Sequence, residues 1–121
     1  MNKDLEAEIN DLHANICAGL ADPKRIMILY HLAEGPQTVN DLAAAIHTPQ
    51  PTVSRHLKVL RERGMVRATR QAQSVEYRLG DVRLIQALDL LLAVLRDNLA
   101  HRADLMEQLS VASEEQEETA L

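Results

Sequence analysis

Short or planar hydrogen-bonding side chains recur in residues 50–63. They are Gln50, Thr52, Ser54 and His56. Such side chains fit the donor and acceptor patterns that base pairs expose in the major groove of duplex DNA. Basic side chains in the same segment are placed to meet phosphates, which position a protein on DNA without reading its sequence; these are Arg55, Lys58, Arg61 and Arg63. The segment therefore predicts contacts to double-stranded DNA.

Residues 50–63 also have the pattern of an amphipathic helix that would hold these side chains in place. Val53, Leu57 and Leu60 recur at helical spacing, so they would pin the opposite face of the helix to a core. Gly64 is the residue type expected just after a helix C-terminus. The polar face of this helix is predicted to point outward.

The flanking segments give the order of a known motif. A short helix from Val39 to about Ile46 is capped by Thr38 and leads through a tight connection into the helix just described. Two short strands, 65–69 and 74–79, then surround a turn at 70–73. Two short helices joined by a tight turn and followed by a two-stranded ribbon are the order of a winged helix-turn-helix, whose second helix lies in the major groove.

Further helices are predicted on both sides of this unit. Apolar side chains at spacings of three and four mark a first helix, and they are Leu5, Ile9, Leu12, Ile16 and Leu20. A second helix runs from about Pro23 to Ala33, because Asp22 can cap it and Pro is tolerated at its first position. The fold class is therefore mostly α with a small β-ribbon.

A long helix is predicted from Val82 to about Leu109, and it is apolar over more than one stripe. A helix apolar over half its circumference needs two partners, here its own domain and a second copy of the chain. The residues that follow Ser110 are acidic and poor in apolar side chains, which predicts a disordered tail. The chain is thus divided into a domain of residues 1–110 and a tail of residues 111–121.

The net charge of −5 argues, taken as a whole, against a nucleic-acid partner. Residues 50–83, however, hold eight Lys and Arg against three acids, a local charge of +5, so the rest of the chain carries −10. A basic stripe on an acidic body is the electrostatic pattern of a protein that binds duplex DNA.

Composition excludes several other classes. No apolar run approaches the roughly 18 residues that a membrane helix needs, and the charged N-terminus has no secretory signal, so a soluble cytoplasmic protein is expected. Cys17 is the only cysteine, which excludes an intrachain disulfide and a four-cysteine zinc site. Tyr30 and Tyr77 are the only aromatic residues, which disfavours modules that stack single-stranded bases.

Three motifs, residues 20–25, 39–42 and 50–60, resemble those of the ArsR/SmtB transcriptional repressors. The resemblance runs from about Ile16 to Leu95. It implies a homodimer of α-α-α-α-β-β-α subunits joined through the first and last helices. It also implies binding to an imperfect inverted repeat at a promoter and release when an inducer binds.

The resemblance assigns two sets of residues. The DNA-binding set combines the 50–63 helix with the ribbon, whose tip would be residues 70–74: Gln50, Thr52, Ser54, Arg55, His56, Lys58, Arg61, Arg67, Arg70, Gln71, Gln73 and Ser74. The dimer set is Leu5, Ile9, Leu12, Ile16, Leu84, Leu88, Leu91, Leu92, Leu95 and Leu99. The chain departs from the family at Ala72, where the ribbon usually turns on a glycine, and at Pro49, where a Ser cap is common.

The sensing sites of relatives can be tested against the residues present. The soft-metal site in the third helix would fall on Thr38 and Asn40, which offer no thiolate. The zinc site of the last helix would fall on a set that includes two non-ligands: Asp81, Arg83, Val94 and Asp97. Relatives that sense sulfur species use two cysteines, and this chain has one.

Two weaker arrangements stay open. His13 and Cys17 are four residues apart on the first helix, where an imidazole can activate a thiol for redox sensing. Asp97, His101 and Asp104 share one face of the last helix and could bind a divalent metal such as nickel or zinc, with His13 joining across the dimer. The bland alternatives are a packed cysteine and a solvated polar face.

The sequence therefore predicts a DNA-binding repressor and not an enzyme, since no third group orients the thiol–imidazole pair and no oxyanion-forming loop is nearby. One alternative is a winged-helix module that binds proteins and not DNA. The other is a repressor that is switched by oxidation of Cys17.

Overall fold

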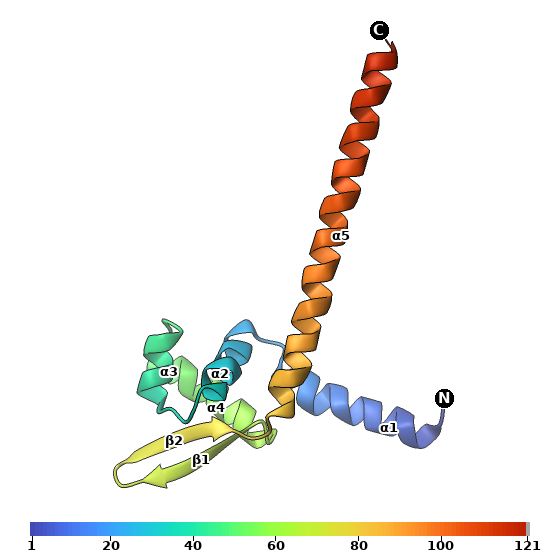
Figure 1. Ribbon diagram of the computed structural model, residues 1–121. Helices are drawn as coiled ribbons and strands as arrows, with labels where there is room; N and C mark the ends of the chain where they lie inside the picture. The colour runs from blue at the N-terminus through green and yellow to red at the C-terminus, as the bar shows by residue number, and fades with distance from the viewer. Residues whose placement is uncertain (121) are drawn as a thin grey trace. The chain divides into compact units, whose positions relative to one another are not determined.

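The computed structural model describes the backbone of residues 1–120 and the side chains of residues 1–115. It divides into two units, residues 1–85 and the residues from 86 onward, which are described separately. The elements of the first unit follow the order of a winged helix-turn-helix: α1 (Lys3–Leu12), the π-helical segment η1 (His13–Cys17), α2 (Pro23–Ala33), α3 (Val39–Ala45), α4 (Gln50–Glu62), β1 (Val66–Gln71) and β2 (Ser74–Leu79) (Figure 1). The predicted fold class is confirmed.

Helices α2 and α3 begin at side-chain caps that the sequence predicts. The carboxylate of Asp22 accepts a hydrogen bond from the backbone N–H of Lys24 at 2.8 Å. Thr38 and Asp41 form a reciprocal capping box at the start of α3. These bonds satisfy backbone donors that have no partner inside a helix, so they fix where α2 and α3 start.

The core of the first unit is aliphatic. Val53, Leu57 and Leu60 hold one face of α4 fully buried, as predicted. The core side chains that surround them come from α2, α3, the start of β1 and the residue just before it: Ile28, Leu29, Leu32, Leu42, Met65 and Val66. Burying a side chain of this size stabilises the fold by roughly 1.5–3 kcal/mol, so α4 is held firmly by one face.

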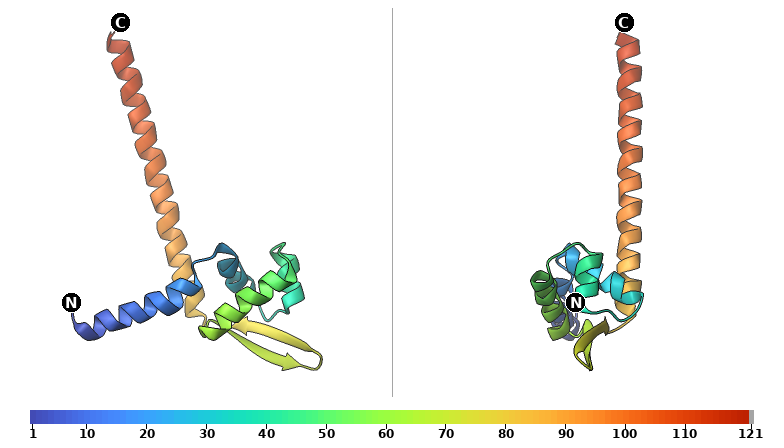
Figure 2. Two further views of the ribbon diagram at one scale, coloured as in Figure 1. Left: turned by 180° about the vertical axis from the view of Figure 1, so that it is seen from behind. Right: turned by 90° about the vertical axis from the view of Figure 1, so that its left-hand side faces the viewer.

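Strands β1 and β2 form an antiparallel hairpin that packs through β1 against α4 (Figure 2). The pairing runs from Val66 opposite Leu79 to Gln71 opposite Ser74. Strand β2 has its predicted bounds, whereas β1 runs two residues further than predicted and so shortens the turn. Ala72 in the turn has a φ of 53°, in the left-handed region that favours glycine. Ala72 therefore takes the conformation that the family's glycine would take.

The first helix ends differently from the prediction. A regular helix is predicted to about Leu20, whereas the structure changes from α to π geometry over His13–Cys17. No residue of α1 or η1 is buried, and Leu5, Ile9 and Leu12 are 42–50% exposed. The apolar stripe of α1 is therefore free in the single chain to meet a partner.

Helix α5 spans Arg83–Ala120 and so continues beyond its predicted end at Leu109. The residues after Ser110 are mostly Glu, Gln and Ala, which have high helix propensity, and this accounts for the longer helix. Leu121 and the side chains of residues 116–120 lie outside the described part, and the division at residue 110 stays a prediction. No helix in the described part is long and apolar enough to cross a bilayer.

Candidate nucleic-acid interface

The exposed face of α4 carries most of the hydrogen-bonding and basic side chains predicted to contact DNA. Because the opposite face of α4 is buried in the core, this face points to solvent. Its exposed residues are Gln50, Ser54, Arg55, Lys58 and Arg61. The basic side chains among them form no ion pair that the structure describes. The face therefore offers free positive charge and amide or hydroxyl groups on a helix of the right class to enter a groove.

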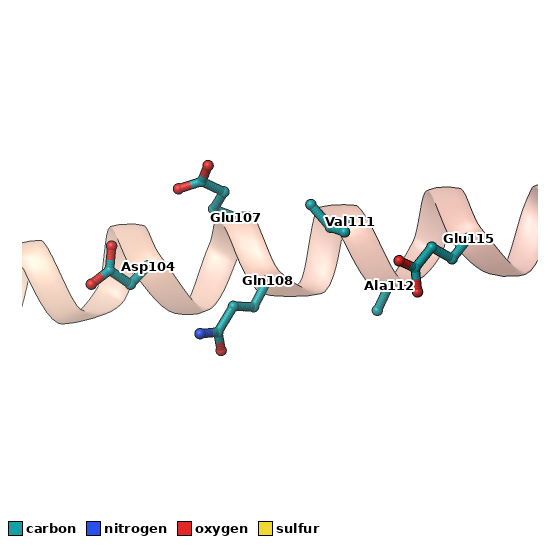
Figure 3. Close-up of a pocket in the computed structure, with 6 residues that line it drawn as sticks. All are labelled: Asp104, Glu107, Gln108, Val111, Ala112 and Glu115. Atoms are coloured by element: carbon teal, nitrogen blue, oxygen red, sulfur yellow. The ribbon is translucent and has the colours of Figure 1, made fainter.

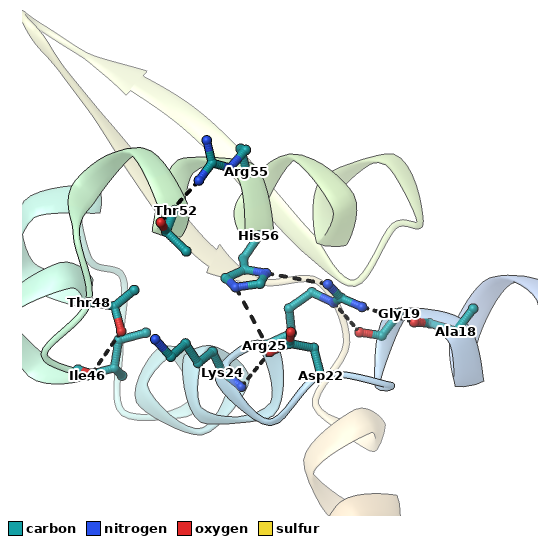
Figure 4. A network of polar contacts seen from close by, with 10 residues as sticks. All are labelled: Ala18, Gly19, Asp22, Lys24, Arg25, Ile46, Thr48, Thr52, Arg55 and His56. Carbon is teal, nitrogen blue, oxygen red and sulfur yellow. Dashed lines mark hydrogen bonds and ion pairs between the residues drawn. The ribbon is translucent and has the colours of Figure 1, made fainter.

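Thr52 and His56 lie on one edge of α4 and are half-buried. The hydroxyl of Thr52 accepts a hydrogen bond of 3.2 Å from Arg55. The ring of His56 lies against Asp22 and Arg25, as Figure 4 shows, and its side chain is 14% exposed. The ring of His56 thus faces α2 and not outward, because position 56 follows Val53 by three residues and precedes Leu60 by four, which brings it to the edge of the core face. A base contact from His56 stays a prediction.

The contacts of Asp22 affect its ionisation. Partial burial raises the pKa of its carboxyl group, but the backbone N–H of Lys24 and the neighbouring His56 lower it more, so the pKa lies below its ordinary value of 3.8. Asp22 is therefore a carboxylate at neutral pH, and it caps α2 and faces α4 at the same time.

The hairpin places two arginines directly opposite each other. Arg67 on β1 pairs with Arg78 on β2, and both are exposed. Like charges at paired positions repel, so this pair weakens the hairpin unless an anion lies between or near the guanidinium groups. Arg78 belongs to the basic stripe of residues 50–83 but is not among the predicted DNA-binding residues, and a turn at 70–73 would have placed Arg67 opposite Glu76 instead.

The remaining predicted residues of the hairpin are exposed near its tip. Side chains alternate along a strand, which puts Arg70 on the face opposite to that of Arg67 and Gln71. The Ser74 hydroxyl donates a hydrogen bond of 3.2 Å to the backbone oxygen of Gln71. The tip therefore presents polar groups on both faces of the ribbon.

Two shallow grooves show which of these residues lie together. One is lined by Gln50 at the start of α4, by Gln73 and Ser74 of the hairpin, and by Thr38 and Asn40 at the start of α3. The other is lined by Ser54, Lys58 and Arg61 of α4 and by Tyr77 of β2. The structure thus places polar residues of α4 and of the hairpin along the same grooves, together with Asn40 and Tyr77, which are not among the predicted DNA-binding residues.

The comparisons with known proteins identify this arrangement. Residues 22–68 match the family described as "Bacterial regulatory protein, arsR family". The chain is 41% identical over 83 residues to the biofilm growth-associated repressor of Agrobacterium fabrum (strain C58 / ATCC 33970), covering 66% of this chain and 71% of that protein. The chain belongs to the ArsR family. This family consists of DNA-binding transcriptional regulators and not of enzymes.

Other relatives agree on the fold. The crystal structure of the transcriptional repressor BigR from Xylella fastidiosa is 35% identical, covers 78% of this chain and 96% of its own, and gives a TM-score of 0.67. The solution structure of the homodimeric winged helix-turn-helix DNA-binding domain Mb0332 from Mycobacterium bovis is 29% identical, covers 83% of this chain and 93% of its own, and gives a TM-score of 0.71.

Two further relatives are matched over a smaller share of their own length than these solved structures. The HTH-type transcriptional repressor SmtB of Mycobacterium tuberculosis (strain ATCC 25618 / H37Rv) is 43% identical over 74 residues, covering 61% of this chain and 55% of that protein. The regulator NmtR of the same strain is matched over 63% of its length. The chain therefore spans between half and two thirds of these two relatives.

Thr38 and Asp81, onto which the family resemblance maps metal sites of relatives, make other interactions in this chain. The Thr38 hydroxyl accepts a hydrogen bond from the backbone N–H of Asp41. Asp81 accepts two hydrogen bonds from the guanidinium Nε of Arg83, at 3.1 and 3.2 Å, and one from its Nη2 at 2.7 Å. The carboxylate of Asp81 is thus paired with the guanidinium group of Arg83.

The structure also shows how the two weaker candidate sensing sites are arranged. In the described residues, no three His, Cys, Asp or Glu side chains come close enough together to hold a metal ion. Asp97, His101 and Asp104 therefore form no three-ligand cluster within one chain, and a metal site that includes His13 of a second copy stays a prediction. Cys17 is a free, exposed thiol in η1, and His13 is exposed in the same segment.

Proposed function

We propose that this member of the ArsR family is a sequence-specific, DNA-binding transcriptional repressor that acts as a homodimer, binds an inverted-repeat operator and is released by an inducer. The observation that carries the proposal is the exposed face of α4, where Arg55, Lys58 and Arg61 form no ion pair with the described residues 1–115. Ser54 shares this face, and the hairpin adds Arg67 and Arg78. Base contacts would come from Gln50 and Ser54, and phosphate contacts from the basic side chains.

The proposed dimer rests on apolar faces that the single chain leaves exposed. On α1 these are Leu5, Ile9 and Leu12, and on α5 they are Leu91, Leu95 and Leu99, with exposures of 51–60% for the α5 residues. Leu88, which the sequence places in the same interface, is only 5% exposed in the single chain, so it is not part of the free face. Exposed apolar stripes of this kind mark protein contacts, and Mb0332 is described as homodimeric.

The direct test is selection of duplexes from a random DNA library by the purified full-length chain, followed by a gel shift with the selected duplex. The proposal predicts recovery of an inverted repeat and a shifted band whose stoichiometry is two chains per duplex. Recovery of no duplex above the background of a scrambled sequence would instead favour a winged-helix module that binds proteins.

A second mode of regulation is favoured by one observation, the exposure of the Cys17 thiol. Two chains joined through Cys17 after oxidation would form a covalent dimer with altered DNA affinity. Non-reducing gel electrophoresis after peroxide treatment tests this, with Cys17→Ser as the control. If the wild-type chain forms no covalent dimer, this switch does not operate.

A further inference from the structure

Arg25, in the first turn of α2, contacts two other segments of the first unit. Its Nε donates a hydrogen bond of 2.8 Å to the backbone oxygen of Gly19, and its Nη2 donates one of 3.2 Å to that of Ala18. Its third nitrogen, Nη1, lies 3.4 Å from Nδ1 of His56 on α4 (Figure 4). One guanidinium group thus joins the residues just after η1 to the helix that carries the candidate DNA-binding face.

The geometry defines what His56 can do. A guanidinium has donors and no acceptor, so a hydrogen bond between the two groups requires Nδ1 of His56 to accept, which leaves Nε2 as the ring nitrogen that carries a proton. Nε2 in turn points toward Asp22, with its Oδ1 4.0 Å away. Both ring nitrogens therefore face α2, and neither is directed outward with Ser54 and Arg55.

A second arginine ties α4 to the same region. Nη1 of Arg63, the residue that ends α4, donates hydrogen bonds of 2.6 and 3.1 Å to the backbone oxygens of Ala14 and Asn15 in η1. Cations are favoured at the carbonyl end of a helix, so both arginines suit these places. Helix α4 is thereby linked at two points along its length to the end of the first helix.

We propose that Arg25 and His56 are positioning residues of the DNA-binding site, which set the rotation of α4 so that Ser54 and Arg55 face outward. This inference rests on the proposed function. His56 then contributes to specificity through Arg25, not by touching a base. Since η1 directly follows α1, the contacts of Arg25 and Arg63 also connect α4 to the helix whose apolar stripe the proposed dimer would bury.

The test uses three variants of the full-length chain and the duplex selected by the wild type, with a scrambled duplex as the non-specific probe. His56→Asn keeps an acceptor oxygen close to the place of Nδ1 but has no group at the place of Nε2. His56→Phe keeps a ring and removes the acceptor. Arg25→Lys keeps the charge but has one head group, which cannot serve both the Gly19 oxygen and His56 in the fork geometry of the guanidinium.

If Arg25 and His56 position α4, His56→Phe and Arg25→Lys each weaken binding to the selected duplex about tenfold, the effect of losing one hydrogen bond to a charged group. Binding to the scrambled duplex changes by less than about twofold, since the phosphate-contacting side chains are untouched. The double variant is no weaker than the weaker single one, because both remove the same contact. His56→Asn keeps wild-type affinity.

Other outcomes overturn the inference. If His56 reads a base, His56→Asn loses affinity like His56→Phe, the two single losses multiply in the double variant, and repeated selection with His56→Asn returns an altered sequence. Wild-type affinity in His56→Phe and Arg25→Lys shows that the contact positions nothing. Thermal unfolding of each variant by circular dichroism separates a loss of folded chain from a loss of binding. If His56→Phe does not fold, His56→Asn still distinguishes a positioning role of His56 from a base contact, because it keeps the polar contact with Arg25. Failure of the wild type itself to select any duplex would refute the proposed function, and the positioning role with it.

Discussion

Asp81 and Arg83 form an exposed ion pair, with Arg83 Nη2 2.7 Å from Asp81 Oδ2. Arg83 donates both side-chain and backbone hydrogen bonds to Asp81, and these lower the pKa of Asp81 from its ordinary value of 3.8 to about 2. The folded chain thus binds this proton more weakly than the unfolded chain does. The pair therefore stabilises the fold above about pH 4, and its contribution disappears as the pH falls toward 2.

This reasoning predicts the behaviour of Asp81→Asn. Its midpoint of thermal unfolding should lie below that of the wild type at pH 5 to 7, and the gap should shrink as the pH falls from about 4 to 2. Arg83→Gln should give a smaller gap with the same direction of pH dependence, because it removes the guanidinium hydrogen bonds and leaves the backbone N–H of residue 83 bonded to Asp81. Parallel curves for wild type and variant over the whole range would show that the pair has no role in stability.

Ala72 carries a second prediction for a single residue. A non-glycine residue in the left-handed region, such as Ala72, destabilises the folded chain by roughly 1–2 kcal/mol. Replacement by glycine removes this strain, but it also raises the conformational entropy of the unfolded chain, which offsets part of the gain. Ala72→Gly should therefore raise the free energy of unfolding by up to about 1 kcal/mol in urea denaturation. Ala68→Gly, in the body of β1, should lower it by a similar amount, and a loss in both variants would mean that the turn is not strained at Ala72.

Among the elements, the hairpin holds two like charges, Arg67 and Arg78, at paired positions, where they destabilise it and give it positive charge for phosphates. Arg78→Gln removes the repulsion between Arg78 and Arg67, so the free energy of unfolding should rise by about 0.2–1 kcal/mol. The same change should weaken binding to all DNA sequences alike and make the log–log salt slope shallower by about one. Arg67→Gln should behave in the same way.

The control for the hairpin variants is Arg96→Gln, which removes an exposed charge from α5, outside the basic stripe. It should leave both stability and the salt slope unchanged. If Arg78→Gln stabilises the chain but leaves DNA affinity as it was, the outer face of the hairpin does not meet DNA.

Much of the element structure follows from local sequence. Helix α2 has its predicted bounds because Asp22 and Pro23 define its start, and Gly64 with a φ of 73° ends the α4 region as a glycine should. The π geometry of η1 and the orientation of His56 could not be predicted in this way. Both lie at contacts between residues distant in sequence, Arg63 with Ala14 and Arg25 with His56.

For the whole chain, the distribution of charge matters more than its sum. The basic stripe carries +5 and the remainder −10, and much of the acidity lies toward the end of α5. Figure 3 shows part of that end, where the carboxylates of Asp104, Glu107 and Glu115 lie beside Gln108 and Ala112. Negative charge in the same molecule opposes loose attachment to DNA and leaves specific binding to the basic stripe.

The acidic end gives a prediction of its own. Removal of residues 111–121 should raise the affinity for a scrambled duplex several-fold at low salt, and the gain should fade as salt screens the charges. Changing the four glutamates in that stretch to glutamine should have the same effect at full length, which separates charge from length. An unchanged non-specific affinity in both variants would refute this role.

The central claim is that the exposed face of α4 binds the phosphates and bases of duplex DNA, and the salt dependence of binding tests it most directly. For the selected duplex, the logarithm of the association constant should fall linearly with the logarithm of salt concentration, by about 0.9 for each phosphate contacted. Arg55→Gln should make that slope shallower by about one. A flat response in the wild type, or a slope that Arg55→Gln, Lys58→Gln and Arg61→Gln all leave unchanged, would contradict the account.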